Sequence, residues 1–323
     1  MYHRIAQPQS DVWNIAVSPV NFEQQLQLLK KSGKVVPLKA LVQGLEEGSL
    51  QSRSMAITFD DGYADNYEVA VPLLEKYRLP ATFFIASGNI GKETEFWWDE
   101  LEQLILFSED LPPAFSMNIG GEAINISLAE EERLDDKLHR QHQQWRAFVT
   151  EPPGQRAALF LQLWQHLRPL PALEQQRILA QIRQWANVPQ QYRANYRSMT
   201  RAQLQQLSAK PLFDVGIHTV THPALADHTE DFQFKELTDN REQLREITGM
   251  TPALLAYPYG SYNHQTLNIA EKLKIKGAVT TEDTLVTPQT NLLRIGRFQV
   301  NNWNGSMFTE QLKGWQSTKN PVL

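Results

Sequence analysis

Short apolar runs alternate with amphipathic segments over the first ~90 and the last ~110 residues of the chain. Residues 56–59 and 81–85 are apolar, β-branched or aromatic and predict two buried strands, and residues 66–77 between them place their apolar side chains on one helical face. The same alternation returns after residue 212. The expected strands are 35–38, 56–59, 81–85, 212–217, 253–257, 277–280 and 293–300, and the expected helices are 22–31, 66–77, 232–248 and 265–274. This repetition is typical of a parallel sheet or barrel in the α/β class.

The alternation of strands and helices is interrupted between residues 96 and 197, where the sequence is rich in Gln, Glu and Leu at helical spacing. Prolines divide this segment into about four helices. Residues 115–126, with Gly120 and Gly121 at their centre, suit a hairpin instead. We therefore expect one barrel domain over residues 1–323, with 96–197 as a mostly helical insertion within it.

Composition narrows the classes of function. The chain has 323 residues, 41% hydrophobic and 21% charged, as in a globular protein with a sizeable core. The net charge of -5 does not indicate the excess of basic residues that binds phosphate groups, so nucleic acid is not an expected partner. There is no cysteine, so any metal must be held by histidines and carboxylates. The start of the chain has no apolar segment, and no run approaches the ~18 residues of a membrane span, which predicts a cytoplasmic protein, although a processed N-terminus would look the same.

Two adjacent carboxylates follow the strand 56–59. Asp60 and Asp61 precede Gly62, and a turn at this glycine can bring both side chains to the carboxyl end of the strand, where α/β folds place their chemistry. Two bare carboxylates that lie close together repel each other unless a cation lies beside them. The pair therefore indicates a metal, while the competing interpretation is an ordinary Asp-Gly turn.

Two histidines four residues apart follow another predicted strand. His218 and His222 can chelate one ion from a single turn, and Pro223 restrains His222 away from helical geometry, which favours a loop at the end of the strand. One Asp and two His residues form a common catalytic metal set that leaves positions open for water and substrate. A third strand ends in Tyr257-Pro258-Tyr259-Gly260, a tight turn that can aim a backbone N–H at an oxyanion, or that simply ends the strand.

These three segments, in this order, resemble the first three motifs of the polysaccharide deacetylase family, the carbohydrate esterases and enzymes similar to chitooligosaccharide deacetylases. The motifs are Thr58 to Tyr63, His218 to Pro223, and Tyr257 to Gly260. The start of the chain, Tyr2-His3-Arg4-Ile5, also resembles family members found in surface-polysaccharide pathways. The resemblance implies a distorted (β/α) barrel with about seven parallel strands.

The resemblance also implies roles for individual residues. Asp61, His218 and His222 would bind a divalent metal ion, usually zinc, with cobalt, nickel or manganese as alternatives. Asp60 would be the general base that takes a proton from the attacking water, and the backbone N–H of Tyr259 would stabilise the oxyanion. These roles agree with the chemistry inferred from the residues alone.

The chain lacks two residues of the family pattern, so other residues would have to take over their roles. Many members carry an arginine just before the Pro-Tyr-Gly turn to orient the base, whereas this chain has Ala256 and Tyr257 there. Arg294 and Arg297 would face opposite ways on a regular strand, so at most one is expected to point into the site. The resemblance to similar family members, which carry a late arginine, implies that Arg297 is the substitute. No histidine follows His264, so the late catalytic histidine of the family is absent. The resemblance to relatives that open with Tyr-His implies that His3 protonates the leaving amine instead. The competing interpretations are an ordinary surface arginine for Arg297, and a buried strand histidine or a frayed terminus for His3.

The sequence thus predicts a metal-dependent deacetylase that removes acetyl groups, most of all N-acetyl groups, from a sugar in a glycan or glycan precursor. Two other interpretations stay open: a degenerate barrel that binds a glycan or assists polysaccharide assembly, and an amidase acting on a small molecule that is not a sugar. The expected partner is carbohydrate, and the oligomeric state is not predicted.

Overall fold

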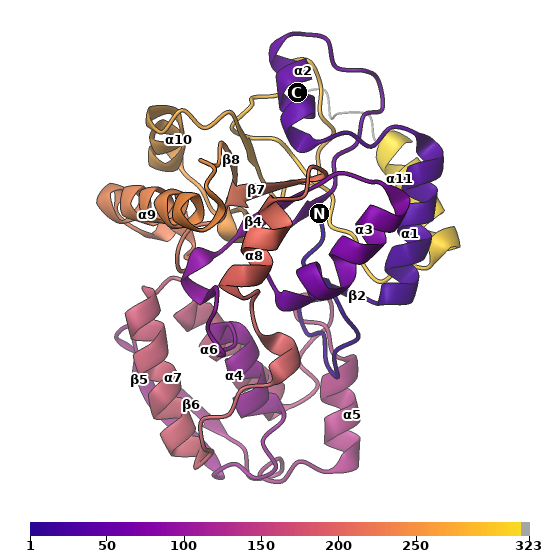
Figure 1. Cartoon of the computed structure of the whole chain (residues 1–323). Helices are drawn as coiled ribbons and strands as arrows, with labels where there is room; N and C mark the ends of the chain where they lie inside the picture. Colours follow the sequence, from indigo (N-terminus) through magenta and orange to yellow (C-terminus); the bar gives the residue numbers. More distant parts are fainter. Residues whose placement is uncertain (318–323) are drawn as a thin grey trace. The chain divides into compact units, whose positions relative to one another are not determined.

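The computed structural model describes residues 1–317 (Figure 1). The chain divides into two compact units, one formed by Met1–Gln7, Ile15–Lys92 and Ser198–Leu323 and the other by Pro8–Asn14 and Glu93–Arg197. The expectation of one barrel domain with an insertion at 96–197 stays a prediction.

The first unit is built on a parallel sheet of five strands. Their order is β3 (Thr58–Phe59), β4 (Ala81–Ile85), β7 (Phe213–Ile217), β8 (Leu254–Ala256) and β9 (Gly277–Val279). Parallel bridges add one segment at each edge, Tyr2 beside Phe59 and Ile295 beside Val279. Seven chain segments therefore run side by side.

The two edges of this sheet meet. The backbone nitrogen of Met1 donates to the carbonyl of Phe298 at 2.8 Å, and that of Val300 donates to the carbonyl of Met1 at 2.9 Å. These bonds join the two edges of the curled sheet, in agreement with the distorted (β/α) barrel that the resemblance implied, although this sheet has five regular strands instead of about seven.

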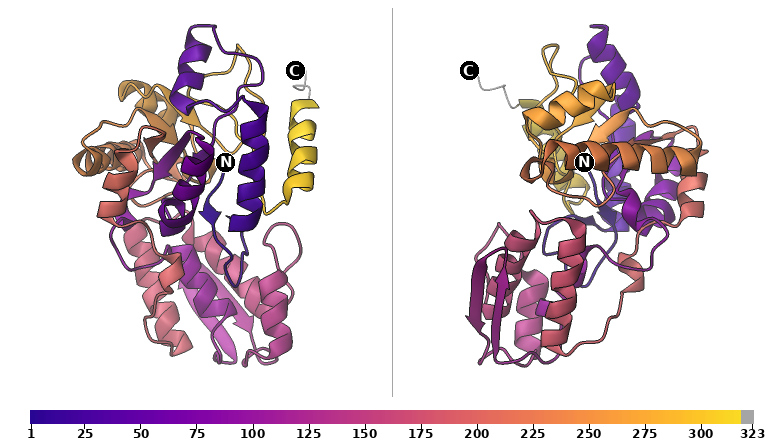
Figure 2. Two further views of the ribbon diagram at one scale, coloured as in Figure 1. Left: turned by 45° about the vertical axis from the view of Figure 1, so that its right-hand side comes forward. Right: turned by 90° about the vertical axis from the view of Figure 1, so that its left-hand side faces the viewer.

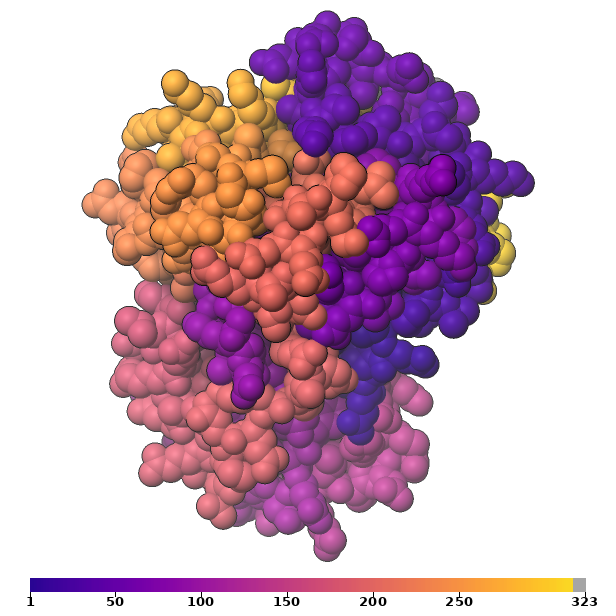
Figure 3. All heavy atoms as spheres, viewed as in Figure 1, coloured from indigo at the N-terminus to yellow at the C-terminus, as the bar shows by residue number. Residues whose placement is uncertain are grey.

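Helices cover the outside of the curled sheet. On the face shown in Figure 3, α3, α8 and α9 lie over the sheet. The helices of this unit are α1 (Pro19–Ser32), α2 (Leu38–Glu46), η1 (Asn66–Ala70), α3 (Val71–Tyr77), η2 (Ser87–Asn89), α8 (Arg201–Ser208), η4 (Leu225–Asp227), α9 (Glu230–Thr248), η5 (Pro258–Gly260), α10 (His264–Lys272) and α11 (Gly305–Ser317), and a small parallel pair is formed by β1 (Arg4–Ile5) and β2 (Ala16–Val17).

Two expected strands are wrong. Residues 35–38 make only a single bridge, from Val35 to Met55, because Pro37 serves as the N-cap of α2 and starts a helix at Leu38. Residues 293–300 make one bridge at Ile295 and otherwise follow an irregular path. Helices α2, α8 and α11 were not predicted, since each is short or lies beyond the alternating region.

The core between strands and helices is aromatic. Phe59 stacks on Tyr2 at 5.3 Å and on Phe83 at 4.8 Å between ring centroids, and Phe83 meets Phe213 edge-on at 5.6 Å. Because side chains alternate along a strand, Thr58 and Asp60 face the opposite side from Phe59. The same alternation that buries the phenylalanines therefore turns the polar residues of β3 away from the helices.

The second unit combines a hairpin with helices (Figure 2). Its elements are α4 (Trp97–Leu106), β5 (Ala114–Ile119), β6 (Glu122–Ser127), α5 (Asp136–Gln144), α6 (Gln155–Leu167), α7 (Ala172–Ala186) and η3 (Ala194–Tyr196). Gly120 and Gly121 make the turn between β5 and β6 with φ of 63° and 93°, as the hairpin prediction requires. Within the described residues, no helix combines the length and the apolar character needed to cross a membrane.

Candidate metal centre and catalytic pair

The two carboxylates lie where β3 ends. The backbone N–H of Asp60 donates to the carbonyl of Tyr2 at 3.0 Å, so Asp60 still belongs to the barrel. Asp61 then adopts φ of 74° and Gly62 φ of 93°, both left-handed. A Cβ on Gly62 would also lie 3.2 Å from the side chain of Ile85. The sharp turn therefore needs glycine, and it sends the two carboxylates to different partners.

The two histidines come from the loop after β7. His222 has φ of 58° and Thr219 φ of 64°, an outlying conformation for a β-branched residue. The hydroxyl of Thr219 accepts a hydrogen bond from the backbone N–H of His222 at 3.0 Å, which stabilises the loop. The ring of His218 is oriented by its Nδ1, which lies 2.8 Å from the carbonyl of Ala256 at the end of β8. Its Nε2 is thereby left to face Asp61.

Asp61, His218 and His222 converge on one point. Asp61 Oδ1 lies 3.3 Å from the Nε2 atom of His218 and 3.3 Å from that of His222, and all three residues are buried. Bonds of 2.0–2.1 Å to a tetrahedral zinc ion would separate neighbouring ligand atoms by about 3.3–3.4 Å. The donor set and its spacing therefore fit a divalent metal ion.

Helix α9 supports the histidine loop with two buried polar side chains. Asn240 accepts the backbone N–H of His218 at 3.1 Å, and its amide donates to the carbonyl of Ile85 at 3.0 Å and to that of Thr219. Glu236, one turn earlier, accepts the backbone N–H groups of Val220 and Thr221 at 2.8 and 2.9 Å. The strained loop is thus held from the outside by one helix.

Asp60 pairs with Arg297 and not with the two histidines. The two terminal nitrogens of Arg297 donate to the two carboxylate oxygens of Asp60, each at 2.7 Å. Arg297 also donates to Thr58 Oγ1 at 3.1 Å and to the carbonyl of Thr280 at 2.9 Å. Arg294, by contrast, is exposed and donates to Tyr262 at the surface, so of these two arginines it is Arg297 that reaches Asp60.

The electrostatics keep both carboxylates ionised. Burial acts to raise the pKa of Asp60, but the charge and hydrogen bonds of Arg297 outweigh it and lower that pKa. Burial likewise opposes ionisation of Asp61, yet hydrogen bonds from His218 and His222 hold its pKa well below the usual range. Burial lowers the pKa of His222, while that of His218 is raised, because its hydrogen bond to Asp61 and the nearby carboxylate charges outweigh the effect of burial. Because Arg297 compensates the charge of Asp60, the remaining buried anion is Asp61, which two imidazoles face, and this arrangement suits a bound cation.

The remaining predicted site residues lie around this centre. Tyr259 follows β8 with φ of 58°, and its ring meets the ring of His222 edge-on at 4.5 Å between centroids. His3 is half-buried, and its pKa is lowered chiefly by burial while the charges of Asp61 and Asp60 act to raise it. Asn66 donates to the backbone carbonyl of His3 at 2.6 Å, which holds this segment against the start of η1. The structure thus brings all seven predicted residues into the barrel unit, and their roles stay proposals.

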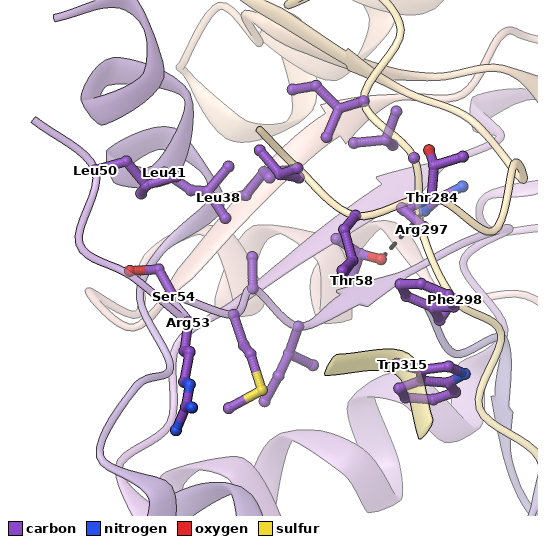
Figure 4. Close-up of a pocket in the computed structure, with 18 of the residues that line it drawn as sticks. Leu38, Leu41, Leu50, Arg53, Ser54, Thr58, Thr284, Arg297, Phe298 and Trp315 are labelled. Atoms are coloured by element: carbon purple, nitrogen blue, oxygen red, sulfur yellow. Dashed lines mark hydrogen bonds between the residues drawn. The ribbon is translucent and has the colours of Figure 1, made fainter. Parts of the chain in front are cut away.

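A cavity of about 680 Å³ lies on the other side of Arg297 (Figure 4). Thr58 and Arg297 form part of its wall, and most of the rest is apolar, with Leu38 and Leu41 of α2 and Trp315 of α11 among the lining residues. The guanidinium of Arg297 therefore lies between this cavity and the carboxylate of Asp60.

Sequence reasoning did not single out Asn240 and Glu236. Their signal is a polar stripe, Gln233, Glu236 and Asn240, at helical spacing on the buried face of α9. Helix α5 also contains a buried histidine, His142, whose Nδ1 lies 2.8 Å from the carbonyl of Leu106. Helix α5 is polar enough to suggest exposure, but His142 lies on its buried side.

Comparison with known proteins agrees with this geometry. The sequence model of the polysaccharide deacetylase family matches residues 47–106 and 166–278, which include Asp60, Asp61, His218, His222 and Tyr259. A poly-beta-1,6-N-acetyl-D-glucosamine N-deacetylase of Staphylococcus aureus is 39% identical over 84 residues. That match spans 26% of this chain and only 29% of the relative.

Solved structures share the fold over nearly the whole chain. IcaB from Ammonifex degensii superposes with a TM-score of 0.57 at 18% identity, covering 98% of this chain and 95% of that one. The Streptococcus pyogenes deacetylase PplD, solved in complex with acetate, gives a TM-score of 0.54 at 21% identity, with coverage of 96% and 95%. These likenesses show that the arrangement of strands and helices is a shared one.

Proposed function

Because the chain belongs to the polysaccharide deacetylase family, we propose that it removes N-acetyl groups from an N-acetylated glycan by hydrolysis, releasing acetate and leaving a free amine. The observation that carries this proposal is the pairing of two buried carboxylates with different partners: Asp61 with two histidines, and Asp60 with Arg297. In this proposal Asp61 holds a metal ion and Asp60 acts as a base.

The metal-binding part would consist of Asp61, His218 and His222. A bound divalent ion, zinc in our proposal, would supply Lewis-acid polarisation of the acetyl carbonyl and lower the pKa of a water molecule. Nitrogen and oxygen donors at this spacing suit zinc and are also compatible with cobalt, nickel or manganese.

The proton transfers would be carried out by the chain's own residues. Asp60, kept anionic by Arg297, takes a proton from the attacking water. The backbone N–H of Tyr259 donates to the oxyanion that develops on the acetyl oxygen. His3 gives a proton to the departing amine, so that water adds across the amide bond and acetate and an amine result.

Acetate release from N-acetylglucosamine oligomers tests the proposal directly. We expect turnover in the presence of zinc, loss of turnover on chelation, and recovery when zinc is restored. Asp60→Asn, which keeps the shape of the side chain, should abolish turnover while zinc still binds. Full activity of Asp60→Asn would contradict the assignment of the base.

The same measurement separates the two other interpretations. A degenerate glycan-binding barrel would bind the oligomers and release no acetate under any metal. An amidase for a small molecule would leave the oligomers intact and release acetate or another acid from simple N-acylated amines. Either result would overturn the proposal.

A further inference from the structure

Three aromatic rings meet in the second unit, well apart along the sequence. Trp13 belongs to the segment Pro8–Asn14, Phe148 to the loop before α6, and Trp164 to α6 itself. Ring centroids lie 4.8 Å apart for Trp13 and Trp164, 5.5 Å for Phe148 and Trp164, and 6.0 Å for Trp13 and Phe148. Every pair is in contact range, so the rings form one continuous aromatic cluster.

Phe148, the outer ring of this cluster, is held in a conformation that costs free energy. Phe148 is 63% exposed and has φ of 63°, and the next residue, Val149, is 71% exposed. A bulky side chain in the left-handed region is strained, and leaving the ring in water forgoes the gain of burial. Strain that the surroundings enforce is concentrated at functional positions, so this outlier points to a use for the exposed ring.

The cluster rests on a rigid base. Trp13 packs on Phe160, which is fully buried, at 5.5 Å between centroids, and Trp164 packs on the buried Trp97 at 6.4 Å. The backbone N–H of Ala147 donates to the carbonyl of Val12 at 2.9 Å and ties the segment that carries Trp13 to the loop that carries Phe148. The rings are therefore positioned in advance, and a ligand would not have to order them.

The charge around the rings selects the kind of ligand. The guanidinium of Arg168 lies 5.9 Å from the centre of the Trp164 ring. Anionic membranes and nucleic acids are bound by groups of basic residues, and this chain is acidic overall. An aromatic surface suits a neutral ligand that offers an apolar face and keeps its polar groups in water. The C–H face of a β-linked pyranose has this character.

We propose that Trp13, Phe148 and Trp164 form a glycan-holding site in the second unit, which binds pyranose rings of an N-acetylated glucosamine chain by stacking. The choice of sugar rests on the proposed function. The site shares no residue with the metal centre, and it would keep a polymeric substrate attached to the protein between turnovers by raising its effective concentration.

Direct binding tests this site without requiring catalysis. The full chain carrying Asp60→Asn is titrated with a β-linked N-acetylglucosamine pentamer by calorimetry, with tryptophan fluorescence as a second signal. Trp164→Ala in this background should raise the Kd about 10-fold, whereas Trp164→Phe, which keeps a ring, should stay within about threefold. Leu173→Ala is the matched control: Leu173 is 81% exposed in the same unit and is not aromatic, so its removal should leave the Kd unchanged. An unchanged Kd in Trp164→Ala overturns the site.

Phe148→Gly separates a ligand-binding ring from a structural one. Glycine relieves the left-handed strain, so we expect an unchanged or higher Tm together with a Kd raised about fivefold or more. A lower Tm with an unchanged Kd would show that the ring only packs. If Phe148→Gly instead dissociates a dimer in sedimentation, or abolishes pelleting with phospholipid vesicles, while glycan affinity is unaffected, the patch is a protein or membrane interface and the proposal is wrong.

The outcome is independent of the activity assay. Suppose that the wild-type protein releases no acetate but binds the pentamer in a way that depends on Trp164. This result would contradict the proposed function and leave the glycan-holding site in place. If the protein releases acetate but substitutions of Trp164 and Phe148 leave the Kd for the pentamer unchanged, the glycan-holding site is wrong and the proposed function stands.

Discussion

Arg297 and Asp60 are 237 positions apart in the sequence and form a two-pronged ion pair, with both contacts at 2.7 Å and both side chains almost fully buried. The arginine lies on the segment that closes the barrel between β9 and Met1. Closure of the barrel and orientation of the base therefore depend on the same stretch of chain. A bidentate guanidinium also restricts the carboxylate to one orientation, which a lysine cannot do.

Removing Arg297 should destabilise the protein strongly. Arg297→Gln leaves the Asp60 carboxylate buried without its partner, a change that costs about 3–5 kcal/mol in the free energy of unfolding. Arg294→Gln, three residues earlier and exposed, should cost about 0–1 kcal/mol. Urea unfolding followed by circular dichroism measures both variants.

A double substitution checks the cause of that loss. Asp60→Asn combined with Arg297→Gln removes the buried charge together with its partner, so part of the lost stability should return. Additive losses would show that Arg297 acts through its packing against Phe84 rather than through Asp60.

Arg297 should also set the acid limb of the pH profile of kcat/KM. Asp60 works as a base only when ionised, and the pKa of Asp60 is lowered because the charge of Arg297 outweighs the effect of burial. Loss of that charge raises the pKa, so in Arg297→Gln a smaller fraction of Asp60 is ionised at a given pH. The acid limb should shift to higher pH, with Arg294→Gln as the control that does not shift. An unmoved limb would mean that the limb reports another group.

Much of this site could be predicted from the sequence because its residues follow strands. Asp60 and His218 come directly after predicted strands, Asp61 and His222 follow within five residues of a strand end, and the carboxyl ends of parallel strands meet at one edge. Arg297 could not be predicted from the pattern of strands, because its segment is not a regular strand. The resemblance to the family led to it instead.

The parts that sequence reasoning missed depend on contacts between distant residues. Asn240 and Glu236 read as ordinary polar residues of a helix, and their importance lies in the loop they bind. The segment Val35 to Leu38, which leads into α2, was mistaken for a strand because four residues carry too little periodicity to distinguish a strand from the approach to a helix. The proline that caps α2 was taken to lie within that strand. The left-handed conformations of Thr219 and Tyr259 leave no mark in the amino-acid types at those positions.

Metal binding should stabilise the native protein. A ligand that binds only the folded state at 100 times its Kd adds about 2.7 kcal/mol, so zinc should raise the Tm of chelator-treated protein by several degrees. His222→Gln should abolish this rise. His264→Gln is the matched control, because His264 is exposed at the start of α10 and lies outside the metal set. An equal rise in His222→Gln would place the zinc elsewhere.

Asn240 should affect metal affinity more than overall stability. Asn240→Ala removes the partner of the His218 backbone N–H, and loss of such supporting contacts typically weakens metal affinity about 10–100-fold. Competition with a zinc indicator gives the Kd, and thermal unfolding of the metal-free protein gives the stability. Asp239→Ala, at the neighbouring position on the outer side of α9 where it pairs with Lys235, should leave the zinc Kd unchanged. A Kd for Asn240→Ala within about twofold of wild type would show that the loop keeps its shape without this amide.

The role of His3 can be isolated through the leaving group. An amine departs only when it is protonated, whereas p-nitrophenolate departs without a proton, so a general acid accelerates hydrolysis of the amide and not of p-nitrophenyl acetate. His3→Gln should therefore lower kcat for the N-acetylated sugar about 10²–10⁴-fold and change p-nitrophenyl acetate turnover little. Asn66→Ala, which removes the amide that holds the His3 carbonyl, should fall between wild type and His3→Gln on the sugar. Equal losses on both substrates would mean that His3 supports the fold or the metal centre, and the proton for the amine would then have to come from another residue of the barrel.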